Sequence, residues 1–373
     1  MILQIPMKKT FTILMITFLP VWIFGQGCVA IRGGCGNINS PGNNFNLSKG
    51  EFMAGVGARY FKSFRHFRGT HQETNRVADG TEVINHAVFL DLSISYGISD
   101  RFYGTVVLPF AYNTRSSMYE HGGNPPSGLG ERHSTSSKGL TDMRMGVGYW
   151  LRKPTLGQTY NYALGVGVKL PTGNSSVKDQ FYNQGPKKDQ TVEAVVDQSI
   201  QLGDGAVAYT FEMQGFHKLS DRMILNATAF YLLNAREHNN VLTRNGQSYY
   251  SCPDQFAARL GAYILTKNRA WSFYAGGRLE GVPSTDIIGG SAGYRRPGYV
   301  ISAEPGVSFT KNQYSFNLSV PISIIRNRTQ SYEDKQRTAA TGVFTQGDAA
   351  FADYLVNFNF YYRFMPFKKK AMP

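Results

Sequence analysis

The chain has 373 residues, of which 42% are hydrophobic and 17% charged, and its formal net charge is +14. Beyond the N-terminus no apolar run reaches the roughly 18 to 20 residues of a spanning helix, which excludes a helical membrane protein. The 13% aromatic content and the 40 glycines favour β structure with tight turns.

The N-terminus predicts export from the cytoplasm. Lys8 and Lys9 form a basic start, and residues 11–24 form an apolar stretch too short to span a membrane. We assign residues 1–26 to a signal peptide and residues 27–49 to an N-terminal periplasmic segment. Export argues against a nucleic-acid partner. The positive charge then indicates contact with anionic lipid headgroups, an anion-favouring pore, or simply a basic exterior.

The three cysteines show no metal-binding spacing. Cys28 and Cys35 lie close together in an oxidising envelope, so they could form a small disulfide loop; the alternative is two unpaired thiols. Acylation of Cys28 is a further alternative, although Gly25 stands where lipoprotein signals usually carry an aliphatic residue. We expect Cys252 to be structural or incidental. The seven histidines are scattered, so we expect no metal site and no cofactor.

Apolar and polar residues alternate along about twelve segments. In residues 356–364 every even position is large and apolar, while Asn357 and Asn359 occupy odd positions. An extended chain points successive side chains to opposite faces, so each segment has an apolar face and a polar face. Their length, roughly nine to thirteen residues, suits a tilted strand that crosses a bilayer. The segments are 52–60, 88–96, 102–112, 145–151, 162–170, 207–213, 225–233, 256–264, 271–279, 299–309, 314–324 and 356–364.

Short turns and long polar loops alternate strictly between these segments. The turns are 97–101, 153–159, 218–222, 267–269 and 311–313, and the loops are 69–83, 117–138, 172–205, 238–254, 283–298 and 330–350. Outer-membrane barrels have short periplasmic turns and long external loops, whereas a soluble β-sandwich has no reason for this asymmetry. We therefore predict an all-β chain in the cell outer membrane. It has a single closed antiparallel transmembrane β-barrel of about 12 strands at residues 50–364, followed by a basic periplasmic tail at 365–373.

Two glycine-rich stretches resemble a known family. Residues 138–149 read Lys-Gly-Leu-Thr-Asp-Met-Arg-Met-Gly-Val-Gly-Tyr, and residues 163–173 read Ala-Leu-Gly-Val-Gly-Val-Lys-Leu-Pro-Thr-Gly. With residues 107–110 and 201–205, they resemble the outer-membrane β-barrel transporter-like family named for a MetA pathway of phenol degradation. The resemblance, over residues 89–216, implies uptake of small hydrophobic or aromatic molecules. Barrel geometry alone also explains the motifs, because inward glycines leave room in the lumen and Pro-Thr-Gly ends a strand.

Eight charged residues fall at inward positions of the predicted strands and are our candidates for lining the lumen. They either pair across the lumen and narrow it or line a route for a small solute. Basic and acidic members balance, so we expect no strong ion selectivity. The candidates are Asp91, Arg144, Lys169, Glu212, Arg259, Arg278, Glu280 and Glu304.

These patterns favour an outer-membrane channel for passive uptake or efflux of a small molecule, gated by loops. Its expected partners are outer-membrane lipid and the solute. The alternative is a structural or adhesive barrel with a closed lumen and partner-binding loops. An outer-membrane acyl hydrolase is a third and disfavoured hypothesis, because no His-x-Ser sequence places a base beside a nucleophile on one strand face. We therefore assign no catalytic residue and expect no enzyme.

Overall fold

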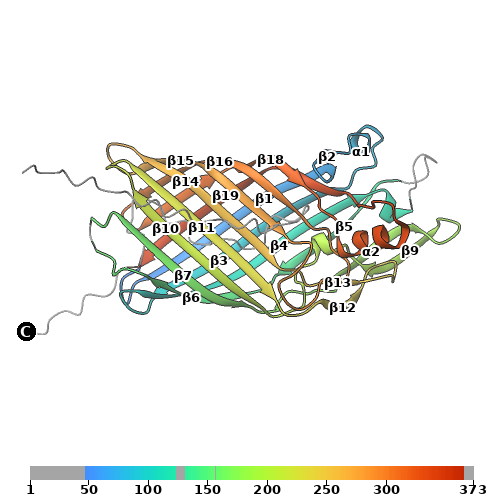
Figure 1. Cartoon of the computed structure of the whole chain (residues 1–373), viewed down its shortest axis with the longest axis horizontal. Coiled ribbons are helices and arrows are strands. Elements are labelled where there is room, and N and C mark those ends of the chain that lie inside the picture. Colours follow the sequence, from blue (N-terminus) through green and yellow to red (C-terminus); the bar gives the residue numbers. More distant parts are fainter. Residues whose placement is uncertain (1–46, 123–130, 156, 365–373) are drawn as a thin grey trace, which may run out of the picture.

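The computed structural model describes residues 47–122, 131–155 and 157–364. Twelve antiparallel strand positions form one closed barrel (Figure 1), which confirms the predicted fold class. In order around the barrel, the strands are β1 (Phe52–Arg68), β3 (Ile84–Gly97), β4 (Phe102–Ser117), β5 (His133–Leu140) with β6 (Arg144–Trp150), β7 (Tyr160–Lys169), β10 (Ala208–Lys218), β11 (Met223–Asn234), β14 (Gln255–Leu265), β15 (Trp271–Val282), β16 (Gly298–Lys311), β17 (Tyr314–Ser319) with β18 (Ile322–Asn327), and β19 (Ala349–Phe364).

Pairing of the last strand with the first closes the barrel. The register of β1 and β19 runs from Phe52 opposite Phe364 to Phe67 opposite Ala349. Lipid offers no hydrogen bonds to the backbone, so a closed sheet without edges is required there.

Side chains on the strands alternate between an apolar outer face and a polar inner face. On β3, Leu92 and Ile94 are 40% and 57% exposed, while Ser95 is 2% exposed. On β19, Phe358 is 41% exposed and Asn357 is buried. A belt of exposed apolar side chains on this scale is stable where it faces lipid. The protein is therefore an outer-membrane β-barrel, as the alternation predicts.

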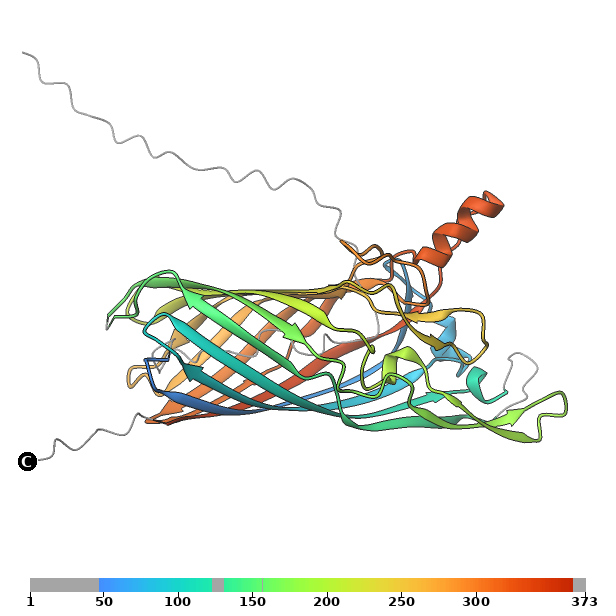
Figure 2. The same cartoon turned by 90° about the horizontal axis from the view of Figure 1, so that it is seen from below.

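The two ends of the barrel differ (Figures 1 and 2): turns join the strands at one end, and long loops with their own secondary structure extend from the other. We refer to these as the periplasmic and the outer end. No helix in the described ranges is both long and apolar enough to cross a membrane. The elements at the outer end are β2 (His71–Gln72), α1 (Asn75–Ala78), η1 (Tyr119–His121), β8 (Lys178–Gln184), β9 (Gln190–Val195), η2 (Gln198–Ile200), β12 (His238–Leu242), β13 (Tyr249–Ser251) and α2 (Tyr332–Thr341).

The outer halves of several strands depart from the predicted ranges. β1 continues to Arg68 rather than ending at Tyr60, and β5 occupies part of the predicted loop 117–138. Beyond the bilayer both faces of a strand can meet water, so the apolar alternation fades there while the hydrogen-bonded ladder continues. The predicted segment 314–324 is interrupted between β17 and β18, where Pro321 has no N–H to donate.

The predicted loop 330–350 contains helix α2, which projects sideways from the outer end (Figure 2). Its start is a capping box: the Asp334 N–H donates to Ser331 Oγ, and the Ser331 N–H donates to the Asp334 carboxylate. Gly342 ends it in the left-handed conformation. The sequence carries both signals, but the prediction treated the segment as loop.

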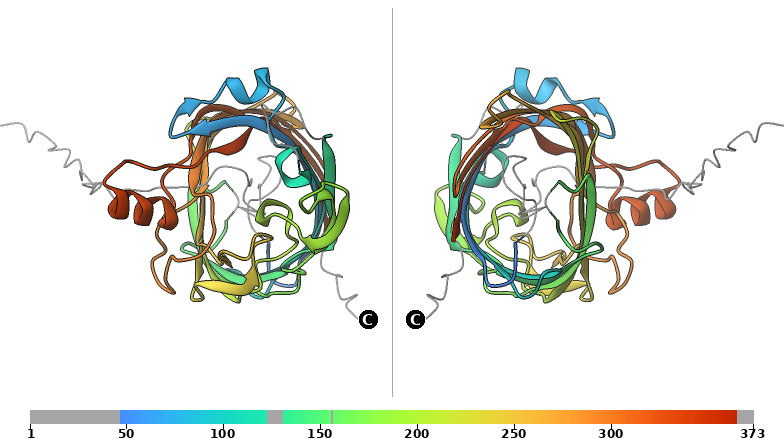
Figure 3. Two further views of the ribbon diagram at one scale, coloured as in Figure 1. Left: turned by 90° about the vertical axis from the view of Figure 1, so that its right-hand side faces the viewer. Right: turned by 90° about the vertical axis from the view of Figure 1, so that its left-hand side faces the viewer.

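The long connection between β7 and β10 turns back into the barrel (Figure 3). We call its inward part, residues 196–206, the plug segment. Ile200 is 1% exposed and Leu202 is 5% exposed. Leu202 packs in one cluster with inward side chains of the wall, including Phe89 of β3 and Leu355 of β19. Burial of one leucine is worth about 1.5 to 3 kcal/mol, so the plug segment is held partly by apolar contact.

Candidate functional site: a plugged lumen

The long loop is fastened to the wall at the break between β5 and β6. Asp142 lies in that break, and its two carboxylate oxygens accept hydrogen bonds from Gly173 N at 3.0 Å and Asp204 N at 3.1 Å. Lys169, the last residue of β7, forms ion pairs with Asp204 and, at 3.5 Å, with Asp142. Gly173 begins the loop and Asp204 ends it, so one carboxylate holds both ends.

These contacts require glycine at two places. A Cβ on Gly173 would lie 2.5 Å from the carbonyl oxygen of Leu202, and a Cβ on Gly203 would lie 2.8 Å from that of Gly173. Thr172 Oγ1 accepts from Met143 N and donates to the Thr141 carbonyl, both at 2.8 Å. Three of the four stretches behind the family resemblance, 138–149, 163–173 and 201–205, therefore meet in space, where they anchor the loop. From the sequence, these motifs were explained by turn formation and by space in the lumen. That explanation did not include the contact between the motifs.

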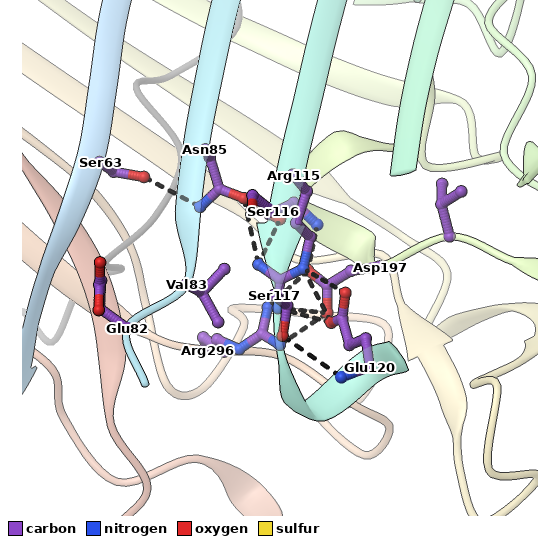
Figure 4. A network of polar contacts seen from close by, with 12 residues as sticks. Ser63, Glu82, Val83, Asn85, Arg115, Ser116, Ser117, Glu120, Asp197 and Arg296 are labelled. Carbon is purple, nitrogen blue, oxygen red and sulfur yellow. Dashed lines mark hydrogen bonds and ion pairs between the residues drawn. The ribbon is translucent and has the colours of Figure 1, made fainter. Parts of the chain in front are cut away.

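Asp197, at the start of the plug segment, is held by two arginines (Figure 4). Arg296 binds it in bidentate fashion at 2.8 and 2.6 Å, and Arg115 Nη2 lies 3.6 Å from its carboxylate. Its carboxylate also accepts from Ser199 N at 3.0 Å, which caps η2. Burial disfavours the charge, but Arg115 and Arg296 outweigh it and hold the pKa of Asp197 far below its usual range.

Arg115 is itself fixed by the wall and a neighbouring loop. Its Nε donates to Glu120 at 2.8 Å, and its Nη1 donates to Asn85 Oδ1 at 3.2 Å. Asn85 in turn donates to Ser63 Oγ at 3.0 Å (Figure 4). The chain of contacts joins β1, β3 and β4 to the plug segment, so the arginine is oriented before it meets Asp197.

The plug segment separates an inner cavity from the outer surface. The inner cavity has a volume of about 90 Å³, and two outer clefts measure about 520 and 490 Å³. Arg296 lines all three spaces, and Tyr250 lines the inner cavity and the larger cleft. Tyr250 donates its hydroxyl to the Val196 carbonyl at 3.0 Å. The Asp197–Arg296 pair and Tyr250 thus form the partition.

Three of the predicted lumen residues line the inner cavity: Asp91 of β3, Arg144 of β6 and Lys169 of β7. Arg59 of β1, which the prediction omitted, lines it too and is near enough to Asp91 and Glu280 to interact electrostatically. Arg59 occupies an odd position in the alternation of 52–60, so the pattern that found the other candidates could have found it.

The remaining candidates lie on β10, β14, β15 and β16. Arg259 Nε donates to Glu304 at 2.9 Å, and Arg278 Nη2 donates to Glu280 at 2.7 Å. These pairs join near neighbours on the wall. Glu212 belongs to neither pair and lies opposite Gly165 of β7.

Aromatic side chains narrow the periplasmic half of the lumen. Tyr103, Trp150 and Tyr263 belong to a buried cluster contributed by seven neighbouring strand positions. Tyr103 Oη accepts from Gln214 at 2.6 Å, and the Arg259 guanidinium stacks 3.7 Å from the ring centre of Tyr274. Sequence reasoning assigned polar and small residues to the inner face and did not anticipate this cluster.

Cys252 is buried, and its thiol donates to the Asp204 carbonyl at 3.2 Å. Burial raises its pKa to about 12, so it is a packed, unreactive thiol at neutral pH. Cys28 and Cys35 lie outside the described residues.

Residues 289–293 read Gly-Gly-Ser-Ala-Gly and match the Gly-x-Ser-x-Gly pattern of many serine hydrolases. The pattern lies in the loop between β15 and β16 rather than on a strand-to-helix turn. Ser291 Oγ accepts a hydrogen bond from Asp286 N at 2.9 Å. The setting is that of a structural turn.

The fold resembles solved outer-membrane barrels. An outer membrane channel from Pseudomonas putida F1 is 13% identical, with a TM-score of 0.57 over 87% of this chain and 99% of that one. A Pseudomonas aeruginosa FadL homologue (11% identical, TM-score 0.41, 85% and 90% covered) and the P. putida toluene transporter TodX (10%, 0.40, 89% and 94%) superpose less closely. No family model and no curated protein matches the sequence. The first of these structures shows the same fold.

Proposed function

We propose that the protein is a gated outer-membrane channel for passive uptake or efflux of a small hydrophobic molecule, aromatic molecules included. The observation that carries this proposal is the inner cavity, which a segment of the chain's own loop separates from the outer clefts. The resemblance of residues 138–149 and 163–173 to the transporter-like family named for a MetA pathway of phenol degradation supports it. We include membership of that family in the proposal.

The size of the inner cavity requires the plug to move. A dry cavity of about 150 Å³ accommodates benzene, whereas this one measures about 90 Å³. An aromatic solute of that size therefore does not fit in this cavity while Leu202 stays in place. Passage requires the plug segment to leave the lumen, at least as far as Leu202.

Withdrawal of the plug segment uncovers an apolar wall. Leu202 covers Phe61, Phe89 and Leu355, which face the lumen from three adjacent strands. A hydrophobic solute that replaces Leu202 recovers the burial that the plug gives up. A polar solute recovers none of it, so the site favours apolar cargo.

Flux through the purified protein tests this proposal. The full chain is reconstituted into vesicles with lipopolysaccharide in the outer leaflet, and uptake of labelled naphthalene is compared with uptake of labelled sucrose. We expect protein-dependent entry of naphthalene that exceeds entry of sucrose, and brief conductance events in planar bilayers.

The structural or adhesive barrel is the alternative, and the plug segment inside the lumen together with the large outer clefts favours it. It predicts neither conductance nor protein-dependent uptake. Absence of both signals from a correctly folded barrel would reject the channel.

A further inference from the structure

The larger outer cleft has the size and lining of a ligand site. Its volume of about 520 Å³ falls within the range of small-molecule pockets, about 300 to 1,000 Å³. It lies between β8–β9, the β12–β13 hairpin, the β15–β16 loop and the start of α2. Aromatic and charged side chains line it, among them Phe181, Tyr250, Tyr294, Tyr332, Arg244, Arg296, Arg337, Glu120, Asp197 and Glu333.

Each carboxylate of the cleft already has a donor. Glu120 is bound by Arg115, and Asp197 is bound by Arg115 and Arg296. Glu333 accepts a hydrogen bond from Ser248 Oγ. The acidic groups are therefore committed within the protein.

Two arginines of the cleft differ in this respect. Arg244 donates to the neutral Gln184 side chain at 3.1 Å and stacks 5.0 Å from the ring centre of Phe181. Among the described residues, no carboxylate forms an ion pair with Arg244 or with Arg337. Arg244 and Arg337 are thus two guanidinium groups of the cleft that no carboxylate of the described residues pairs with, and guanidinium groups bind planar anions such as carboxylates in bidentate fashion.

Aromatic faces lie beside these cations. Tyr294 stacks under Arg296, with 5.0 Å from the guanidinium carbon to the ring centre, and Tyr332 is 38% exposed at the first turn of α2. Such rings present flat apolar surface to an aromatic body while the arginines hold its charged end.

We propose that this cleft binds a small aromatic carboxylate, with Arg244 and Arg337 on the carboxylate and Tyr294 and Tyr332 against the ring. The site adds a recognition step to the proposed channel. Arg296 lines the cleft and also forms an ion pair with Asp197. The bound anion therefore lies next to the partition formed by the Asp197–Arg296 pair and Tyr250.

Equilibrium dialysis of the folded full chain in detergent micelles tests the site without any flux, so its outcome is independent of the transport measurement. The probes are 1-naphthoate and 1-naphthalenemethanol, which share a ring system and differ in charge. We expect naphthoate to bind more tightly, and its affinity to fall about fivefold for Arg244→Gln or Arg337→Gln, which corresponds to about 1 kcal/mol each.

Arg68→Gln is the matched control, because Arg68 is an exposed arginine at the outer end of β1 that pairs with Glu73 away from the cleft. Arg68→Gln should leave naphthoate binding unchanged. Partition of the probe into the micelles is the same for every variant, so it cancels when variants are compared. Equal binding of the two probes, or unchanged naphthoate affinity in the Arg244→Gln/Arg337→Gln double variant with native circular dichroism, would overturn the proposal. Displacement of naphthoate by an equal concentration of inorganic phosphate would overturn its aromatic part.

Discussion

At the scale of single residues, the closed state depends on Asp197. Its carboxylate is buried between Arg115 and Arg296, and removing one partner of a buried ion pair typically costs about 3 to 5 kcal/mol. Asp197→Asn keeps the shape and the acceptor for Ser199 N but removes the charge. We expect a rise of a hundredfold or more in the open fraction, measured as open probability in planar bilayers. Asp179→Asn, in the neighbouring β8, is the control and should leave it unchanged.

The same pair predicts how the closed state responds to pH. The pKa of Asp197 is lower in the folded protein than its ordinary value of 3.8. Its stabilisation of the closed state is therefore complete above pH 3.8 and is lost only as the pH falls through the lower folded pKa. Open probability should therefore stay constant between pH 7 and pH 5 if Asp197 governs it. Opening within that window would show that another titrating group controls the plug.

Gly173 provides a steric test of the loop anchor. A methyl group there meets the Leu202 carbonyl at 2.5 Å and Gly203 N at 3.0 Å, both backbone atoms that cannot rotate away. Gly173→Ala should push the plug segment off the wall and raise the open probability at least tenfold. Gly277→Ala is the control, since a Cβ there meets nothing within 4 Å. Equal behaviour of the two variants would contradict the anchor.

At the residue scale, the sequence could place a side chain on the inner face only where a strand carried it. The alternation of β3, β6 and β7 placed Asp91, Arg144 and Lys169, which line one cavity. It had no means of pairing Asp197 with Arg296, because 99 positions separate them and both lie in loops without periodicity. The family resemblance contained Asp142 and Asp204, but only the folded loop shows that they share a lysine.

At the scale of elements, the capping box stabilises helix α2. Ser331→Ala removes the acceptor for Asp334 N and should cost the helix about 1 kcal/mol. Amide exchange within α2 should then be about fivefold faster, while thermal unfolding of the barrel stays the same. Hydrogen-exchange mass spectrometry checks both, with Gln336→Ala as the exposed mid-helix control. Unchanged exchange would mean that tertiary contacts, not the cap, hold α2.

The strands of the barrel were predictable and the short strands in the loops were not, for one physical reason. In the bilayer one face of each strand must be apolar, so the period of two is imposed along the whole segment. At the outer end that constraint disappears. β8, β9, β12 and β13 are short and carry only isolated apolar or aromatic side chains rather than a continuous apolar face, and their pairing depends on turns and on neighbouring loops.

At the scale of the whole molecule, two surfaces with opposite requirements enclose the barrel wall. The outer face must be apolar around the full circumference, whereas the inner face tolerates charge because other side chains and water compensate it. The sequence shows both requirements through alternation, and therefore the closed barrel was predictable. It does not show how the lumen is filled, because the plug segment and the aromatic cluster obey packing rather than periodicity.

Substitutions at two neighbouring residues of β19 test this difference between the outer and the inner face. Phe358 is 41% exposed on the lipid face, and Asn359 lies on the inner face opposite Gly57 and Asn317. Phe358→Arg places a charge in the hydrocarbon at a cost of about 2 to 4 kcal/mol near the midplane. Asn359→Arg, with the same new side chain one position away, should cost less than half as much. Urea titrations of reversible folding into lipid vesicles compare the two, and equal losses of stability would contradict the assignment of the faces.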